Sequence, residues 1–187
     1  MRLSQPRIPP VPDDELSDEQ REILAGLSGK RPALNIYRTL VRAPGALRRF
    51  LEWGGYVLSR RNSLPARERE IVILRVGYNC RSGYEFAQHS RIGLESGLTD
   101  DEIARIKQGA DAGWGPADAA LIRAADELTG DFFVTDATWA ELGRHFDEKQ
   151  RMDVVLTTGQ YTQVSMILNS FGVQTEPGVN VDPDLRK

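Results

Sequence analysis

Residues 64–98 read LPAREREIVILRVGYNCRSGYEFAQHSRIGLESGL and hold most of the side chains in this sequence that are arranged for chemistry. The proline near the start suits a first helical position, and Ile71, Leu74 and Tyr78 then recur at helical spacing on one face. The run IVILRV is also a fair strand by β-propensity, but the proline and the charged ARERE before it favour a helix. The stretch therefore predicts a helix over 65–79.

A second helix is predicted directly after the first. Ser82 and Glu85 have the S-x-x-E spacing of a capping box, in which the serine accepts a backbone hydrogen bond and the glutamate reaches back to the serine. Residues three and four apart share a helix face, so Ser82, Glu85 and His89 lie on one stripe. Gly97 is a stop signal, and residues 99–102 form another capping box. We therefore predict a hairpin of two helices that brings its titratable side chains together.

The rest of the chain also predicts helices and no convincing strand. The signals are capping boxes, prolines at helix starts and apolar residues at helical spacing. The expected helices are one that begins at the Ser17 capping box and stops at Gly29, one over 35–43, one that starts at Pro44, one from Pro116 to Thr129, a short one capped by Asp136, and a long one over 148–171. The predicted fold class is therefore all-α.

Composition describes one ordinary globular domain. The chain has 187 residues, a formal net charge of −3 with both signs interspersed, and one cysteine. This charge pattern contains no cluster of positive charge that would attract nucleic acid or an anionic membrane. A single cysteine fits a reducing cytoplasm. The first dozen residues contain four prolines and no apolar signal-peptide core. We expect a cytoplasmic protein with an extended N-terminal arm over 1–13, one all-α domain over 14–175 and a C-terminal tail over 176–187.

The segment 154–175 contains no charged residue. Its length is enough to span a bilayer, yet it is rich in Thr, Gln, Ser, Asn and Gly, which membrane insertion would penalise. A helix on the surface of a monomer normally shows water a charged face. This helix is therefore predicted to be buried on several sides or to pack against another subunit. A homo-oligomer is expected, in which the proline-rich arm either lies on a neighbouring subunit or moves freely.

In these segments the chain resembles the carboxymuconolactone decarboxylase family, which includes the alkylhydroperoxidase D proteins. The peroxidase branch of that family carries a glutamate and then C-x-x-C-x-x-x-H, and the glutamate and histidine fall on Glu70 and His89. Both cysteine positions are replaced here, by Ser82 and Glu85, so the sequence looks like the cysteine-free branch. The segments RIGLESGLTDDEIARI, ADAALIRAADEL and GQYTQVSMILNSFGV extend the resemblance over residues 30–175.

The resemblance implies an alkylhydroperoxidase D-like helical fold with a helix-hairpin core, assembled as a trimer or hexamer. It also implies that His89, Glu85 and Glu70 are catalytic. His89 has an unperturbed pKa of about 6.5, so both of its protonation forms exist near neutrality and it can deliver a proton to carbon. Glu85, one turn away, is expected to hold the charge of the imidazole, and Glu70 to relay or replace the proton.

Three further residues are predicted to contact the substrate. Tyr84 and Ser82 are candidate hydrogen-bond donors to a substrate oxygen, and Trp114, in the loop ADAGWGPA, is a candidate lid. Other interpretations remain open. Ser82 and Glu85 can be a capping box and nothing more, His89 a satisfied core histidine, and Tyr84 and Trp114 packing residues.

No cofactor and no metal are expected, because His89 and Glu85 offer only two ligands at ligand spacing and no Gly-rich phosphate loop is present. The leading hypothesis is a lyase-like enzyme that performs cofactor-free acid–base chemistry, decarboxylation or a related reaction, on a small carboxylated lactone or carbonyl compound. One alternative is an alkylhydroperoxidase-like peroxidase with peroxiredoxin activity, which is disfavoured because Cys80 has no second thiol. Another is a non-catalytic small-molecule-binding or scaffold protein that keeps the family fold.

Overall fold

The protein is helical throughout the part of the chain that the structure describes. A computed structural model describes residues 2–28 and 32–186, and within them there are nine α-helices, two short 3-10 helices and no strand. The α-helices are α1 Asp18–Ser28, α2 Asn35–Leu40, α3 Pro44–Val57, α4 Ala66–Asn79, α5 Gly83–Glu95, α6 Asp100–Ile106, α7 Pro116–Gly130, α8 Asp136–His145 and α9 Glu148–Phe171. The predicted all-α class is confirmed.

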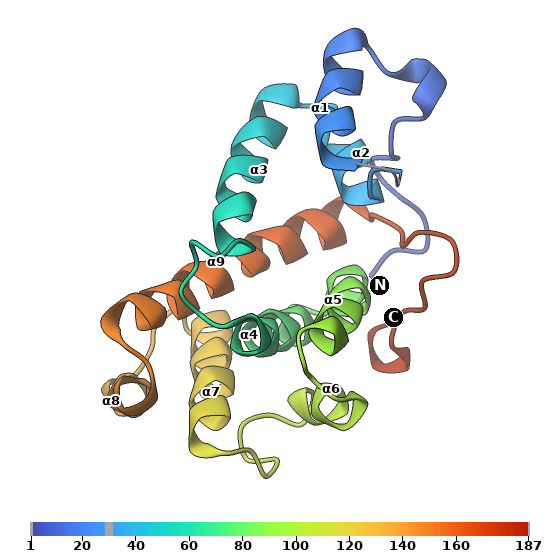
Figure 1. Ribbon diagram of the computed structural model, residues 1–187. Coiled ribbons are helices and arrows are strands. Elements are labelled where there is room, and N and C mark those ends of the chain that lie inside the picture. Colours follow the sequence, from blue (N-terminus) through green and yellow to red (C-terminus); the bar gives the residue numbers. More distant parts are fainter. Residues whose placement is uncertain (1, 29–31, 187) are drawn as a thin grey trace.

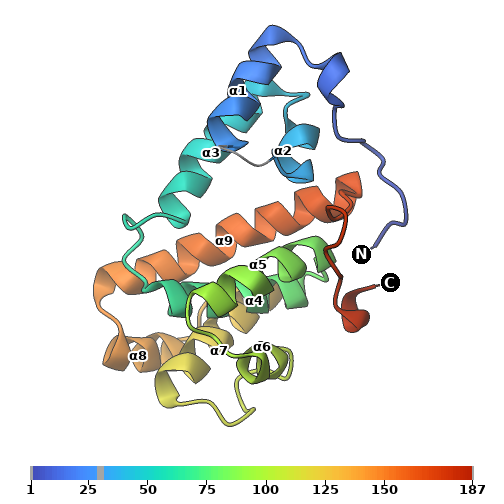
Figure 2. The same ribbon diagram turned by 45° about the vertical axis from the view of Figure 1, so that its right-hand side comes forward.

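Helix α4 is the centre of the fold. It packs against α5, α6, α7 and α9, and in both views α4 and α5 lie between α9 on one side and the α6–α7 pair on the other (Figures 1 and 2). The consecutive residues 70–74 are all fully buried. A helix that is buried all round needs apolar side chains on every face, which is why IVIL also looked like a strand. Tertiary packing overrides the β-propensity of this run.

Helix boundaries follow the local signals closely. Pro44 and Pro116 each begin a helix, and α9 covers the predicted range 148–171. Thr99 caps α6 with a complete capping box, as predicted. Small differences occur elsewhere. Pro65 is the N-cap of α4 rather than its first residue, and Thr135, not Asp136, caps α8, because the threonine hydroxyl accepts from the Thr138 amide. The predicted stop at Gly29 lies outside the described residues.

The predicted capping box of Ser82 and Glu85 is wrong. Ser82 does occupy the N-cap of α5, but its side chain accepts no capping hydrogen bond. Its amide instead donates to the Gly77 carbonyl at 2.8 Å, which closes the end of α4. Because the Ser82 amide is already used, nothing draws the Glu85 carboxyl back toward it, and the Glu85 side chain turns into the protein interior.

The N-terminal segment lies against its own chain. The amides of Arg7 and Ile8 both donate to the Phe171 carbonyl at the end of α9, at 2.8 and 3.2 Å. Val11 is buried and exchanges hydrogen bonds with Arg38 of α2. The contact needs a glycine at residue 172, the αL residue that ends α9, because a Cβ there would lie 2.9 Å from the Gln5 carbonyl oxygen.

Among the helices of the described residues, none is long and apolar enough to cross a membrane.

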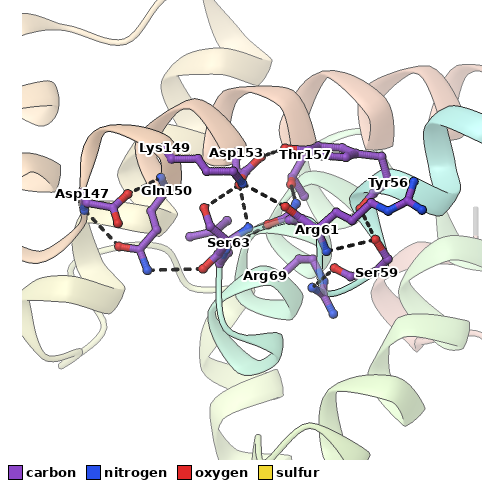
Figure 3. A network of polar contacts seen from close by, with 12 residues as sticks. Tyr56, Ser59, Arg61, Ser63, Arg69, Asp147, Lys149, Gln150, Asp153 and Thr157 are labelled. Atoms are coloured by element: carbon purple, nitrogen blue, oxygen red, sulfur yellow. Dashed lines mark hydrogen bonds and ion pairs between the residues drawn. The ribbon is translucent and has the colours of Figure 1, made fainter.

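A buried carboxylate joins the segment after α3 to α9. Asp153 of α9 accepts from the Tyr56 hydroxyl at 2.6 Å, from both the amide and the hydroxyl of Ser63 at 2.7 and 2.6 Å, and from the Lys149 ammonium at 2.9 Å (Figure 3). Burial opposes ionisation, but the hydrogen bonds from Ser63, Tyr56 and Lys149 outweigh it and lower the pKa of Asp153 to about 2. This network sets the position of α3 against α9.

Replacing Asp153 with asparagine is expected to lower the unfolding free energy at pH 7 by about 2 kcal/mol, because the charged acceptor of four hydrogen bonds is lost. A carboxylate with a depressed pKa stabilises the fold above its unfolded pKa of about 3.9, and this contribution is lost as the pH falls through about 2. Urea unfolding from pH 7 to pH 3 should therefore show a difference from wild type that is constant down to about pH 4 and smaller below it. Asp131→Asn, at an exposed residue, is the control, and a difference that stays constant to pH 3 contradicts the assignment.

Candidate functional site

A cavity of about 340 Å³ lies between α3, α5 and α9, with α2 closing one side. Most of its wall is apolar. The lining residues that carry side-chain polar groups are Tyr37, Tyr84, Glu85, Gln88, His89, Arg91, Gln160 and Tyr161. A mostly apolar pocket with a few convergent polar groups is the usual form of a small-molecule site. Three residues that the sequence analysis selected, Tyr84, Glu85 and His89, are on its surface.

The imidazole of His89 is joined to a carboxylate from the other arm of the helical hairpin. Nδ1 of His89, on α5, lies 2.7 Å from Oε2 of Glu70, on α4. Glu70 is fully buried, and the ring of Tyr161 stands edge-on to the imidazole with the centroids 4.8 Å apart. A carboxylate only accepts hydrogen bonds, so Nδ1 carries the hydrogen and Nε2 is the free nitrogen. Among the described residues Nε2 has no hydrogen-bond partner.

Glu85 is a second buried carboxyl group with a different environment. Its Oε2 accepts from the Ser165 hydroxyl of α9 at 2.5 Å, while its Oε1 has no partner in the described part of the chain. Burial raises the pKa of Glu85 well above its ordinary value, the charge of Glu70 raises it further, and the Ser165 hydrogen bond lowers it only in part. Glu85 therefore keeps its proton at pH values where an exposed glutamate has lost it. Gly77 makes the room, since a Cβ there would lie 3.0 Å from Oε1.

The carboxyl group that contacts the imidazole is that of Glu70 and not, as expected, that of Glu85. The spacing of one turn on the same helix predicts that Glu85 holds the charge of the His89 imidazole. In the structure Glu70 makes that contact and Glu85 binds Ser165. The physical reason is the close packing of α4 on α5, which places the Glu70 side chain directly against the ring. Sequence spacing within one helix could not show a contact between two helices.

Tyr84 lies on the cavity wall but uses its hydroxyl elsewhere. The hydroxyl donates to Oε1 of Glu176 at 2.6 Å, and Gln88 donates to the other oxygen of the same carboxylate. The Asn35 amide, at the start of α2, adds a third hydrogen bond at 2.8 Å. Burial and then the Glu176 hydrogen bond raise the pKa of Tyr84. Glu176 thus ties the C-terminal tail to α5 and α2 beside the cavity.

The other two predicted substrate contacts are not brought to this cavity. Ser82 is fully buried, its hydroxyl has no partner within residues 2–28 and 32–186, and it is absent from the described lining. Trp114 does not line the cavity either; the Arg105 guanidinium covers its ring at 4.8 Å from the centroid. The expected lid is therefore a side chain packed between α6 and the loop before α7. Its partner Arg105 is a residue of α6.

Several site residues were missed because they come from α9. Ser165 binds Glu85, Tyr161 contacts His89, and Gln160 lines the cavity with its buried Oε1 unpartnered by any described residue. Their common signal was present in the sequence, because they belong to the charge-free segment 154–175. That segment was interpreted as buried, which is what its polar but uncharged side chains allow.

The remaining groups considered for chemistry are the thiol of Cys80 and side chains that could bind a metal ion. Cys80 is half-buried at the end of α4, and burial, followed by the charge of Glu85, raises the pKa of its thiol. A raised thiol pKa opposes formation of the reactive thiolate. Across the described ranges no group of three or more His, Cys, Asp or Glu side chains could hold a metal ion.

The arrangement of helices is found in known structures. The chain superposes on the alkylhydroperoxidase AhpD core of an uncharacterized peroxidase-related protein from Ralstonia eutropha JMP134, with a TM-score of 0.78, 18% identity, and coverage of 91% of this chain and 93% of that one. An uncharacterized peroxidase-related protein from Silicibacter sp. TM1040 gives a TM-score of 0.74 at 14% identity over 95% and 93% of the two chains. The debrominase Bmp8 in complex with 2,3,4-tribromopyrrole gives 0.76 at 11% identity over 93% and 94%. No curated protein matches the sequence.

The helices of the described residues thus have the alkylhydroperoxidase D-like fold. Residues 44–127 match the model of the Carboxymuconolactone decarboxylase family. The match runs from α3 into α7 and includes Glu70, Glu85 and His89. The resemblance that the sequence analysis identified is confirmed.

Glu85→Gln is expected to change how stability depends on pH. A carboxyl group whose pKa is raised by folding binds its proton more tightly in the native state, so the unfolding free energy of the wild type falls as the pH rises above the unfolded pKa of about 4.3. Glutamine removes this decline, so the variant should gain stability relative to wild type between pH 5 and pH 8. Urea unfolding across that range measures it, with the exposed Glu95→Gln as control. Parallel stability curves for wild type and Glu85→Gln would show that Glu85 ionises normally.

Proposed function

We propose that the protein is a lyase-like enzyme that carries out cofactor-free acid–base chemistry, decarboxylation or a related reaction, on a small carboxylated lactone or carbonyl compound. The observation that carries the proposal is the buried pair of His89 and Glu70, 2.7 Å apart, at the wall of an apolar cavity. An imidazole held in one tautomer by a carboxylate, with its other nitrogen free, can take up and deliver a proton.

The proposed reaction requires the site to deliver one proton to carbon. Loss of carbon dioxide from a lactone acid leaves an electron pair that a conjugated carbonyl can absorb, and a proton must then be delivered to carbon. The imidazolium of His89 can supply that proton from Nε2, because Glu70 stabilises its positive charge. The cavity wall around the intermediate is mostly apolar. Positioned proton transfer of this kind contributes about 10²–10⁴-fold in rate.

Two comparisons bear on the kind of ligand and on the competing peroxidase hypothesis. Bmp8, similar in fold, has been crystallised with 2,3,4-tribromopyrrole, a compact ring of the size that an apolar cavity of about 340 Å³ suits. Two other similar structures are peroxidase-related. A dithiol peroxidase needs two thiols, whereas this chain has only Cys80, with a raised pKa. Acid–base chemistry is therefore favoured over peroxide reduction.

His89→Gln is expected to lower the decarboxylation rate of 4-carboxymuconolactone by about 10²–10⁴-fold while the melting temperature changes little, since the partly polar site accepts the amide. Cys80→Ser should leave the rate unchanged. Carbon dioxide release and the loss of substrate absorbance measure both. No decarboxylation above buffer excludes the namesake activity, and dithiol-dependent peroxide reduction that disappears in Cys80→Ser establishes the peroxidase instead.

We also propose that the protein is a cytoplasmic homo-oligomer. The outer face of α9 exposes Met152, Val155 and Met166, with 53%, 36% and 58% of their surfaces accessible, and no charged side chain lies between Val154 and the end of the helix. An apolar helical stripe without a charged face is characteristic of subunit interfaces.

Light scattering at micromolar concentration should therefore report a trimer or hexamer, and Met166→Glu should shift it toward the monomer, because a charge is placed in an apolar contact. Phe133→Glu is the matched control, because Phe133 is an exposed apolar residue outside α9, and it should leave the assembly intact. A wild-type chain that stays monomeric contradicts the proposal.

A further inference from the structure

Helix α5 presents two neighbouring rows of side chains to the cavity, because residues three and four apart lie on one helix face. One row is Glu85, His89 and Ile92, and the other is Tyr84, Gln88 and Arg91. The second row continues past the cavity. Gln88 and Arg91 also line an adjoining cavity of about 620 Å³, which the C-terminal tail borders. Arg91 therefore lies where the two cavities meet.

The guanidinium of Arg91 is free to bind an anion. It is the one arginine or lysine in the described lining of either cavity, and its side chain is exposed. It makes no hydrogen bond or ion pair with any described residue, although Glu95 follows it by one helical turn. Glu176 borders the adjoining cavity, but its carboxylate already accepts three hydrogen bonds, two from α5 and one from the start of α2. The donors of Arg91 are therefore left for a ligand.

The wall that α3 contributes to the cavity has no side chains at Gly54 and Gly55. A Cβ at Gly54 would meet only Nε2 of Gln160, at 3.7 Å, and a Cβ at Gly55 would meet nothing beyond its own turn of helix within 4 Å. Packing among the described residues thus requires neither glycine, although glycine weakens a helix interior relative to alanine. The two positions leave a smooth wall against which a flat ring fits.

We propose that the cavity binds a flat, apolar carboxylate, with the carboxylate held by Arg91 and the apolar body between the glycines of α3 and His89. The inference rests on the proposed function, because it concerns the same cavity, and it adds the residue that recognises the anion. A guanidinium binds a carboxylate through two parallel N–H···O hydrogen bonds, which also orient the ligand. The group that reacts, whether a second carboxylate or a carbonyl, then faces Nε2 of His89.

The two ends of the ligand contribute differently to binding. Most of the cavity wall is apolar, so burial of the ring supplies most of the affinity. Arg91 is exposed, and an ion pair that stays open to water contributes little. Arg91 therefore sets the preference for an anion over a neutral molecule of the same shape, by about fivefold. Affinity and preference can be measured separately.

The test compares 2-naphthoate with 2-naphthamide, which has nearly the same flat shape and no charge. Calorimetric titration at pH 7 and low salt should give a dissociation constant for naphthoate about fivefold below that for the amide. Arg91→Gln should remove this preference by weakening naphthoate alone, Arg91→Lys should keep part of it, and added salt should reduce it. Arg123→Gln is the control and should match wild type, because Arg123 is an exposed arginine of α7 outside the lining.

The position of the ring is read from the two histidines of the chain. His89 lines the cavity, whereas His145 belongs to α8 and does not. An aromatic ring bound against His89 shifts the proton resonance of its Cε1–H group, and both ligands should cause this shift while the His145 resonance stays in place. The variant His145→Gln assigns the two resonances.

Binding of both compounds, a preference that Arg91→Gln removes and a shift of the His89 resonance together support the inference. It is overturned by equal affinities in the wild type, by a preference that survives Arg91→Gln, by binding that leaves the His89 resonance unmoved, or by no binding of either compound. None of these measurements involves turnover, so a protein that does not decarboxylate 4-carboxymuconolactone can still support it. Melting curves confirm that each variant is folded.

Discussion

The hydrogen bond between Glu70 and His89 is the contact on which the centre of this protein depends. Glu70 lies in a run of α4 that has no solvent-exposed face, and an isolated carboxylate in such a place is strongly unfavourable. The imidazole on α5 provides its partner at 2.7 Å and thereby fixes how the two helices of the hairpin face each other. Removing one partner without putting another hydrogen-bonding group in its place leaves the other buried and unpaired, which destabilises far more than the pair itself stabilises.

The interior of the hairpin also contains Glu85, and the two carboxyl groups avoid direct conflict because their environments differ. Glu70 is bonded to a ring that can carry positive charge, whereas Glu85 meets a hydroxyl, which can neither neutralise nor repel it. Two negative charges in one apolar volume are costly, and burial together with the charge of Glu70 raises the pKa of Glu85. The protein thus keeps an acid and a base near each other without pairing them.

Helix α9 explains why this polar interior is tolerated. It lies along the hairpin, in contact with both α4 and α5 (Figure 2). It supplies the uncharged side chains of Ser165, Tyr161 and Gln160. Hydroxyl and amide groups can satisfy buried acids without adding a charge that would itself need a partner. At the other end of α9, Asp153 holds the segment after α3, so the wall formed by α3 is kept opposite the titratable groups.

The sequence by itself determined the helices, because their signals are local. Prolines at helix starts, capping residues and apolar periodicity act over a few positions, and α4, α7 and α9 accordingly begin and end within one residue of their predicted bounds. It also placed Glu70, Glu85 and His89 in one hairpin. Which carboxyl group meets the imidazole, and that Ser82 takes no part, were decided by packing between elements. Glu85 and Ser165 are 80 residues apart, and no spacing rule within a helix extends that far.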